Sequence, residues 1–479
     1  MTSDLTPDLC ILGAGSAGLA IAAGAQQMGA SCVLVERDKM GGDCLNTGCV
    51  PSKSLLAAGK AARFGALARK YGITYAEPAV DYPAVHDHVH GVIAAIAPND
   101  SPERFEEMGV TVLKGSGHFT DPRTVAVAGE SGTTRVRARR FVIATGSSPM
   151  VPPIPGLDQV PYLTNESVFD LTERPEHLIV IGGGPIGTEL GQAFAHLGAQ
   201  VSIVEMASLL SATDGDLSEV LRRNLTAEGV GLYEQAQVTA VEPDGDGVAV
   251  RVKHDGGEMR LRGSHLLVAA GRRSNLDDLG LDAAGIARGK GGMEVDGRLR
   301  TSNRRVFAAG DVAGGPQFTH VAGYHAGIII KNALFRLPAK ADHSAVPAVT
   351  YTDPEVATVG LTEAQARDRH GDGVRVLTWP FAENDRAQAE RKTEGCVKAV
   401  VDAKGRVLGC GIVGAHAGEL LYPWIIAVQN GGKIGDIAQM IAPYPTWGEV
   451  SKRAAGSFYT PKLFSEKTRR IVRLLARLG

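Results

Sequence analysis

The 479-residue sequence predicts an α/β protein with two similar strand-helix-strand units and a C-terminal α+β domain. An apolar run, a glycine-rich turn, a helix-like segment and a second apolar run occur in this order twice, which is typical of parallel α/β units. From about residue 346, short strand-like runs alternate with helix-like segments, which favours a separate antiparallel domain. The length also suggests about three domains of roughly 150 residues each.

The first unit lies near the amino terminus. Residues 8–18 read "DLCILGAGSAG", an apolar run followed by Gly13, Gly15 and Gly18, and a second apolar run ends at Glu36. Glycines at this spacing allow a tight turn and a close approach of the backbone to a pyrophosphate at a helix N-terminus, and the acid accepts a hydrogen bond from a ribose hydroxyl. The segment is predicted to be a Rossmann-like dinucleotide-binding unit.

The second unit repeats this strand-turn-helix-strand pattern with Gly182, Gly184, Gly187 and Glu205. In both copies the acid stands 23 positions after the first glycine. The alternative is that these glycines only let a helix pack on a sheet. The repeated spacing between strand, glycines and acid favours two bound dinucleotides instead. The run "VEMASLLSATDGD" contains Glu205 and no basic residue. Because an acid there repels a 2′-phosphate, NADH is favoured over NADPH.

Composition shifts suggest where the domains divide. The proline-rich run "TGSSPMVPPIPGL" indicates a linker out of the first unit, and "RRVFAAGD" is a late strand-like run expected to rejoin the first sheet. The expected parts are residues 1–150 (first dinucleotide-binding domain), 151–272 (second), 273–345 (return to the first) and 346–479 (C-terminal domain).

Charge and hydropathy exclude several functions. The 50 Lys and Arg residues nearly cancel 52 Asp and Glu residues, so a nucleic-acid partner is not expected. No basic region precedes an apolar stretch at the amino terminus, and no apolar run reaches the ~20 residues of a membrane span. We expect a cytoplasmic protein without a transmembrane segment, in which the six cysteines do not imply a disulfide framework.

A cysteine motif lies between the two units. Residues 41–53 read "GGDCLNTGCVPSK", and "ATGSSP", "AAGRRSN", "FAAGDV" and "YTDPEVATVG" follow in that order. With these motifs the chain resembles, from Asp8 to about Arg453, the class I flavoprotein disulfide reductases, which include lipoamide dehydrogenase, glutathione reductase and mercuric reductase. The resemblance implies an FAD domain, an inserted NAD(P)H domain and a C-terminal interface domain that forms a homodimer.

The resemblance also implies roles for residues. Cys44 would be the thiol that faces the substrate and Cys49 the thiol beneath the flavin, rather than both being ordinary turn residues. Lys53 would lie beside the flavin ring with Glu189 as its ion-pair partner, and Asp311 would bond the ribityl chain. A helix that begins near the motif would lower a thiol pKa through its dipole.

Further contacts follow from the same motifs. A turn at residues 115–119, "GSGHF", would approach the adenine. The other expected FAD contacts are Gly42, Gly117, Thr145, Gly146, Gly310, Thr319 and His320, and Gly271 is expected at the NAD site. The remaining cysteines lie in apolar runs and are interpreted as core residues: Cys10, Cys32, Cys396 and Cys410.

The sequence departs from the family pattern at two places. Where lipoamide dehydrogenase and glutathione reductase have a histidine base near the C-terminus, this chain reads "YPTWGE", with Tyr444 and Glu449. A phenol remains protonated at neutral pH and mainly donates a hydrogen bond, so efficient dihydrolipoamide oxidation is not expected. Asp43 replaces the usual Thr before the first cysteine and is expected to raise the pKa of Cys44 unless solvent screens it.

Tyr444 resembles mercuric reductase, although the adjacent C-terminal cysteine pair of that enzyme has no counterpart here. The leading hypothesis is an FAD enzyme in which NADH reduces the flavin, the flavin reduces the Cys44–Cys49 disulfide, and the dithiol reduces a small acceptor: a disulfide, a quinone-like compound or a soft metal ion. The alternatives are a dihydrolipoamide dehydrogenase, in which Tyr444 or a water held by Glu449 replaces the base, and a docked structural subunit of a multienzyme complex.

Three other features are interpreted without a catalytic role. His86 and His90 stand one helical turn apart, and we interpret them as part of a solvated helix face because no Cys or further His lies nearby in sequence, so no metal ligand is assigned. His416 and Glu419 are expected to be dimer contacts. The tail has Phe464, Ile471, Leu475 and Leu478 at near-helical spacing between basic residues, and is expected to pack on the dimer rather than on a membrane.

Overall fold

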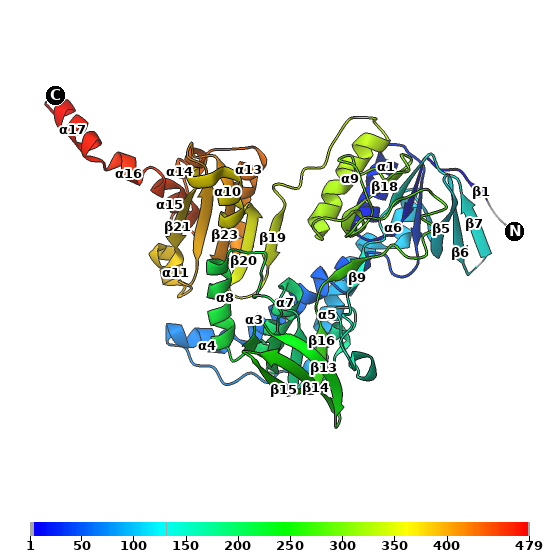
Figure 1. The fold of residues 1–479 in the computed structure, drawn as a ribbon, viewed down its shortest axis with the longest axis horizontal. Helices are drawn as coiled ribbons and strands as arrows, with labels where there is room; N and C mark the ends of the chain where they lie inside the picture. Colours follow the sequence, from blue (N-terminus) through cyan, green and yellow to red (C-terminus); the bar gives the residue numbers. More distant parts are fainter. Residues whose placement is uncertain (1–3, 131, 478–479) are drawn as a thin grey trace.

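The computed structural model describes residues 4–130 and 132–477. The first unit is a parallel five-stranded sheet in the order β18-β8-β2-β3-β4 (Figure 1). Its strands are β2 (Leu9–Leu12), β3 (Cys32–Glu36), β4 (Thr111–Lys114), β8 (Arg140–Ile143) and β18 (Val306–Ala308). Pairing of β18 with β8 confirms that the late strand-like run rejoins the first sheet. All residues of β2 are buried, as parallel strands covered by helices require.

The helices of the first part of the chain and of the return to it are α1 (Ser16–Gln27), α2 (Gly42–Asn46), α3 (Cys49–Ala62), α4 (Phe64–Ala68), α5 (Tyr82–Ile96), α6 (Pro102–Glu107) and α9 (Thr319–Ala333). Of these, α1, α6 and α9 share a hydrophobic cluster with the first sheet, whereas α3 and α5 share one with the second unit. The second sheet contains β1 (Asp4–Leu5), β7 (Gly132–Val136), β6 (Thr124–Gly129) and β5 (Ser116–Asp121). The turn expected at residues 115–119 is therefore wrong for most of its length, because Ser116–Phe119 belong to β5 and pair with β6, and only Gly115 lies before the strand.

The second unit is a parallel four-stranded sheet in the order β12-β11-β10-β16. Its elements are β10 (His177–Ile181), α7 (Pro185–His196), β11 (Gln200–Val204), α8 (Gly215–Ala227), β12 (Gly231–Tyr233) and β16 (His265–Val268), with an antiparallel sheet of β13 (Gln237–Asp244), β14 (Gly247–His254) and β15 (Gly257–Gly263). Strands β9 (Ser147–Pro149) and β17 (Arg272–Ser274) pair with each other and carry the chain between the two units.

The C-terminal unit is an antiparallel five-stranded sheet, as the alternating pattern predicted. Its strands are β19 (Pro347–Thr350), β20 (Glu355–Gly360), β21 (Arg375–Pro380), β22 (Cys396–Val401) and β23 (Val407–Gly414). Its helices are α10 (Glu363–His370), α11 (Asp385–Ala389), α12 (Ala417–Leu420), α13 (Tyr422–Gln429), α14 (Ile434–Ala438), α15 (Glu449–Ser457), α16 (Thr460–Leu463) and α17 (Glu466–Leu475).

The tail leaves the body of the chain. Helices α16 and α17 extend away from the C-terminal sheet (Figure 1), and within this single chain Phe464, Ile471 and Leu475 are exposed. Leu478, the fourth apolar residue of the expected stripe, lies outside the described residues. No helix in the described residues is long and apolar enough to cross a bilayer.

Helix α7 connects the three parts of the chain. It packs on α3, and a Cβ added at Gly59 of α3 would lie 3.2 Å from the carbonyl oxygen of Ala193, so the close approach of the two helices favours glycine there. Next to Ala193, the side-chain amide of Gln192 donates to the carbonyl of Asp353 at 2.7 Å and accepts from its N–H at 2.7 Å. The second unit is therefore fixed to both of the others through one helix.

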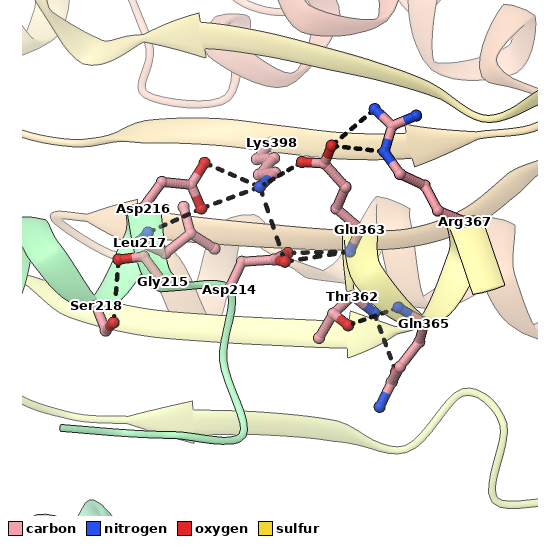
Figure 2. Close-up of polar contacts among 10 residues, drawn as sticks. All are labelled: Asp214, Gly215, Asp216, Leu217, Ser218, Thr362, Glu363, Gln365, Arg367 and Lys398. Carbon is pink, nitrogen blue, oxygen red and sulfur yellow. Dashed lines mark hydrogen bonds and ion pairs between the residues drawn. The ribbon is translucent and has the colours of Figure 1, made fainter. Parts of the chain in front are cut away.

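A buried lysine makes a second connection between the second unit and the C-terminal unit (Figure 2). Lys398 of β22 has a side chain that is 5% exposed, and its Nζ lies 2.9 Å from both Asp216 at the start of α8 and Glu363 of α10. Asp214 is 3.8 Å from the same nitrogen and accepts the backbone N–H of Glu363. A buried charge needs such partners, because removing one partner leaves the others uncompensated.

We expect Lys398→Met to destabilise the chain by roughly 3 kcal/mol, because three carboxylates would lose their shared cation. The measurement is the apparent melting temperature of the holoenzyme. Arg367→Met is the matched control, since Arg367 contacts Glu363 from a half-exposed position and its loss is expected to cost less than about 1 kcal/mol. Equal shifts for the two variants would contradict this assignment.

Candidate active site

A single cavity of about 1940 Å³ connects the two glycine-rich turns with the cysteine motif. It is larger than the ~300–1,000 Å³ typical of small-molecule sites, as two dinucleotides require. Most of the expected contact residues line it. These are Gly13, Gly15, Glu36, Gly42, Cys44, Cys49, Lys53, Gly117, Thr145, Gly146, Gly182, Gly184, Glu189, Glu205, Gly271, Gly310, Asp311, Thr319 and His320.

The glycines of the first turn fit a dinucleotide. Gly13 has φ +103°, which favours glycine. A Cβ at Gly18 would lie 1.9 Å from the carbonyl oxygen of Gly13, so α1 can pack against the turn only with glycine there. A Cβ at Gly42 would lie 2.8 Å from the Cα of Gly15, so the cysteine motif docks directly on the first turn.

The second turn has the same geometry. Gly182 has φ +115°, and a Cβ at Gly187 would lie 2.0 Å from the Gly182 carbonyl oxygen. A Cβ at Gly184 would meet no atom within 4 Å, which leaves space above the N-terminus of α7 for a pyrophosphate. Both turns thus fit the cofactors that the sequence implies, FAD at the first and a nicotinamide dinucleotide at the second.

The two acids have a role that the sequence did not predict. Glu36 accepts the N–H groups of Ala14 at 2.7 Å and Asp38 at 2.9 Å. Glu205 does the same in the second unit, with Gly183 at 2.6 Å and Ala207 at 2.7 Å. Each carboxylate therefore holds its glycine-rich turn in place, and it retains lone pairs for a ribose hydroxyl. Nothing in the local spacing indicates these backbone contacts.

Asp311 begins a short helical turn after β18 and faces the cavity. Its Oδ2 accepts from the Ser147 hydroxyl at 2.5 Å and lies 3.9 Å from Arg272 Nε. Burial raises the pKa of Asp311, while these two partners oppose the shift. Thr145 is joined to Asn275 by two hydrogen bonds, and Gly310 N–H donates to the buried ring of His325.

The two cysteines occupy different helices. Cys44 lies in α2, and Cys49 is the first residue of α3, so the helix expected near the motif begins at the second cysteine. Cys49 Sγ is 3.5 Å from the Thr319 hydroxyl at the N-terminus of α9. A hydrogen bond from Cys44, a second from Thr319 and the charge of Lys53 lower the pKa of Cys49 to about 6, against the effect of burial. The same bond to Cys49, together with burial, raises the pKa of Cys44.

Lys53 and Glu189 form the ion pair that the resemblance implies. Lys53 Nζ lies 2.8 Å from Glu189 Oε2, and the side chain of Glu189 is 6% exposed. The other oxygen of Glu189 accepts the N–H of Tyr351 at 2.8 Å, and Lys53 Nζ lies 4.5 Å from the centre of the Tyr351 ring. Lysine beside the cysteine pair stabilises negative charge there.

Asp43 does not act on Cys44 as expected. Its Oδ1 lies 3.1 Å from Arg272 and accepts from Thr47 and from the side-chain amide of Asn165. The guanidinium neutralises the carboxylate, and the weak remaining effect of its charge falls on Cys49 rather than on Cys44. The expected rise in the Cys44 pKa from Asp43 is therefore wrong, because a basic residue far away in sequence pairs with the acid.

The C-terminal candidates lie elsewhere in this chain. Tyr444 and Glu449 do not line the cavity, and Tyr444 is 70% exposed. Its hydroxyl donates to Asp385 at 2.9 Å, which raises the pKa of Tyr444 further above neutrality. Glu419 lines the cavity, whereas His416 contacts the ring of Trp447. Within this chain, neither Tyr444 nor Glu449 therefore joins the cysteine pair in the cavity.

Other expected residues have clear positions. His320 Nε2 lies 2.9 Å from the carbonyl of Pro347, which also lines the cavity, and the His320 ring stacks on Phe318. Burial lowers the pKa of His320. Cys10, Cys32 and Cys410 are buried, as expected for core residues, and Cys396 is half-buried. Sequence reasoning missed Arg272, Asn165, Ser147 and Tyr351, although all of these except Asn165 lie in motifs that carried the resemblance.

We expect the Cys49 thiol of the reduced enzyme to lose its proton near pH 6, so it reacts as a thiolate above that pH and slows below it. Thr319→Val removes one hydrogen bond and is expected to raise the pKa by roughly half to one pH unit. The measurement is the pH dependence of iodoacetamide addition to the Cys49 peptide, followed by mass spectrometry. Thr319→Ser retains the hydroxyl and should preserve the wild-type pH dependence of alkylation. An unchanged pH dependence in Thr319→Val would show that this hydrogen bond does not lower the pKa of Cys49.

Comparison with known sequences gives a consistent result. The family profile described as pyridine nucleotide-disulphide oxidoreductase matches residues 7–326, and the profile of its dimerisation domain matches residues 346–455. A mercuric reductase of Staphylococcus aureus is 38% identical over 454 residues, which cover 94% of this chain and 82% of the relative. A dihydrolipoyl dehydrogenase of Geobacillus stearothermophilus is 34% identical over 449 residues, which cover 93% of this chain and 94% of the relative.

Solved structures agree with this result. The Cu(II) complex of the HOCl-induced flavoprotein disulfide reductase RclA from Escherichia coli has a TM-score of 0.84 and 27% identity, covering 95% of this chain and 100% of that chain. LpdA from Mycobacterium tuberculosis has a TM-score of 0.85 and 29% identity with the same coverage.

Proposed function

This chain belongs to the pyridine nucleotide-disulphide oxidoreductase family, and from that premise we propose that NADH keeps its Cys44–Cys49 pair reduced and that the pair reduces a small acceptor, with a soft metal ion such as mercuric ion as the leading candidate. The family is FAD-dependent, and its C-terminal domain supports a homodimer. Bound at the first turn, FAD would supply the two-electron link between NADH and the disulfide. A cytoplasmic location suits a thiol pair that NADH maintains.

The observation that carries this proposal is the difference in pKa between Cys49 and Cys44, together with Tyr444 at the position where lipoamide dehydrogenase has its histidine base. The Cys49 pKa of about 6 provides one thiolate at neutral pH, whereas Cys44 holds its proton. A soft metal ion removes that proton by coordination, since a coordinating thiol is deprotonated outright. Two thiolates then give two electrons to the divalent ion and close the Cys44–Cys49 disulfide, and the one proton that Cys44 held goes to water.

Dihydrolipoamide oxidation is the alternative and makes a different demand on the site. It requires a group that takes protons from the substrate dithiol, and a side chain with a pKa near neutrality does this best. The Tyr444 hydroxyl donates a hydrogen bond to Asp385, which raises the pKa of Tyr444 and keeps it protonated, so it supports hydrogen bonding to an acceptor rather than proton removal. Because a relative named dihydrolipoyl dehydrogenase is 34% identical to this chain, the assay below also tests dihydrolipoamide oxidation.

NADH is the proposed reductant because of the surroundings of Glu205. The basic side chains that line the cavity beside the first unit are Arg37 and Lys39, next to Glu36, and Lys53 and Arg272 lie by the cysteine motif. Glu205 faces the second dinucleotide position with both oxygens already fixed by backbone N–H groups. A 2′-phosphate would meet this carboxylate without a compensating cation.

An anaerobic assay with NADH or NADPH against mercuric ion, lipoamide, glutathione disulfide and a quinone tests the proposal. We expect NADH-driven turnover of mercuric ion that falls at least about 100-fold in Cys44→Ser, because the thiolate that takes up the acceptor is lost. Cys396→Ser is the matched control, since Cys396 is half-buried in the C-terminal sheet outside the cavity. Turnover that persists in Cys44→Ser would leave only a flavin reductase.

Tyr444→His tests the assignment of the missing base. A histidine at this position is expected to raise dihydrolipoamide oxidation by at least about tenfold, because positioned acid–base groups contribute ~10²–10⁴-fold. The steady-state rate of NADH formation from dihydrolipoamide is the measurement, and Tyr162→His serves as a control outside the cavity. Rapid oxidation by the wild-type enzyme would instead favour the dihydrolipoamide dehydrogenase alternative.

A further inference from the structure

Three metal-ligating side chains from two distant segments converge beside the second unit. His86 and His90 lie one turn apart on α5, with ring centroids 4.1 Å apart. Asp170 comes from the short helical turn η4 (Val168–Asp170), and its Oδ1 lies 3.6 Å from His90 Nε2. One ligand atom from each residue lies within 4.8 Å of the others, and no other group of three or more His, Cys, Asp or Glu in residues 4–130 and 132–477 meets this condition.

Packing holds the two segments together. Val89 of α5 and Phe169 of η4 are buried in the same hydrophobic cluster. His90 Nε2 lies 3.2 Å from the Phe169 carbonyl, which joins α5 to η4. The buried hydroxyl of Tyr82 fixes α5 separately by donating to the Leu197 carbonyl at 3.3 Å. Because both backbones are fixed by the core, the three side chains need little ordering to meet at one point.

The surroundings orient one histidine for coordination. His86 Nδ1 lies 3.2 Å from Asp87 Oδ1, which leaves Nε2 for an ion. A carboxylate behind a ligating imidazole fixes the ring and raises its basicity. The carboxylates of Asp87 and Asp170 also give the group negative charge, which favours a divalent cation.

The geometry and the donor types indicate which ion fits. Zinc binds nitrogen and oxygen ligands at about 2.0–2.2 Å, so two of its ligands at a tetrahedral angle are about 3.4 Å apart. The observed 3.6 Å between His90 Nε2 and Asp170 Oδ1 is close to this value. On coordination Nε2 would give up its proton and its contact with the Phe169 carbonyl, which can only accept a hydrogen bond. Two imidazoles and a carboxylate, with no thiolate, suit zinc or a similar transition metal better than calcium or magnesium.

We propose that His86, His90 and Asp170 form a binding site for a divalent transition-metal ion of the zinc type, with water completing the coordination. The ion would link α5 to η4, two elements about 80 residues apart in sequence. The segment before η4 carries Asn165, which donates to Asp43 and to the Thr47 carbonyl beside the cysteine motif. None of its ligands belongs to the cysteine pair, and His90 and Asp170 line the same cavity as that pair.

Zinc titration of the untagged, oxidised holoenzyme by calorimetry tests the site, because the oxidised cysteine pair offers no thiolate to the metal. We expect one zinc ion per chain. His86→Gln and Asp170→Asn each remove one ligand and are expected to weaken binding at least tenfold. His88→Gln is the matched control, since His88 is exposed on the same helix and outside the group, and should bind zinc as the wild type does.

Cobalt provides a second readout that identifies the ligands. With Co²⁺ in place of zinc, the visible d–d bands should appear without a thiolate-to-metal charge-transfer band, and they should be lost in Asp170→Asn but kept in Cys44→Ser. Unchanged zinc affinity in both His86→Gln and Asp170→Asn overturns the proposal. A thiolate band that disappears in Cys44→Ser overturns it as well, because the ion would then lie on the cysteine pair.

Discussion

The buried carboxylate of Glu189 is the interaction on which the arrangement of the three parts depends. One oxygen accepts from Lys53 on α3, the other from the backbone of Tyr351 at the edge of the C-terminal unit, and the residue itself belongs to α7 of the second unit. A carboxylate with so little solvent contact is stable only when both oxygens are satisfied. Any displacement of one part relative to the others would leave this charge unpaired, so the junction has one favoured geometry.

That geometry places the chemistry. The N-terminus of α7 lies at the second glycine-rich turn, and the N-terminus of α3 carries Cys49, so two packed helices bring a dinucleotide position and a reactive thiol to one cavity. Gln192 repeats the connection one turn further along α7, and Lys398 adds a buried charge cluster on the outer side. These contacts explain how a site between separate units remains ordered while its cofactors bind to different parts of the chain.

Electrostatic interactions within the cavity give the two cysteines different protonation states. Cys49 receives hydrogen bonds and lies beside a lysine, which favours its thiolate, and Cys44 keeps its proton because it donates to Cys49. Arg272 pairs with Asp43, and the charge of this acid next to Cys44 raises the pKa of Cys49 less than the hydrogen bonds and Lys53 lower it. Tyr444 donates to Asp385 and does not line the cavity, so within this chain it does not stand where a base could take the proton of Cys44.

The sequence by itself determined the features that depend on local spacing: the glycine-rich turns, a helix that begins within the cysteine motif, the late strand of the first sheet and the antiparallel C-terminal sheet. Only the tertiary structure decided which distant groups meet. His86 and His90 looked like a solvated pair because their third partner, Asp170, stands 80 positions away, and the partner of Asp43 was hidden for the same reason. Periodicity and motif spacing describe neighbours along the chain, whereas the charge state and ligands of a side chain depend on packing between elements that sequence distance does not encode.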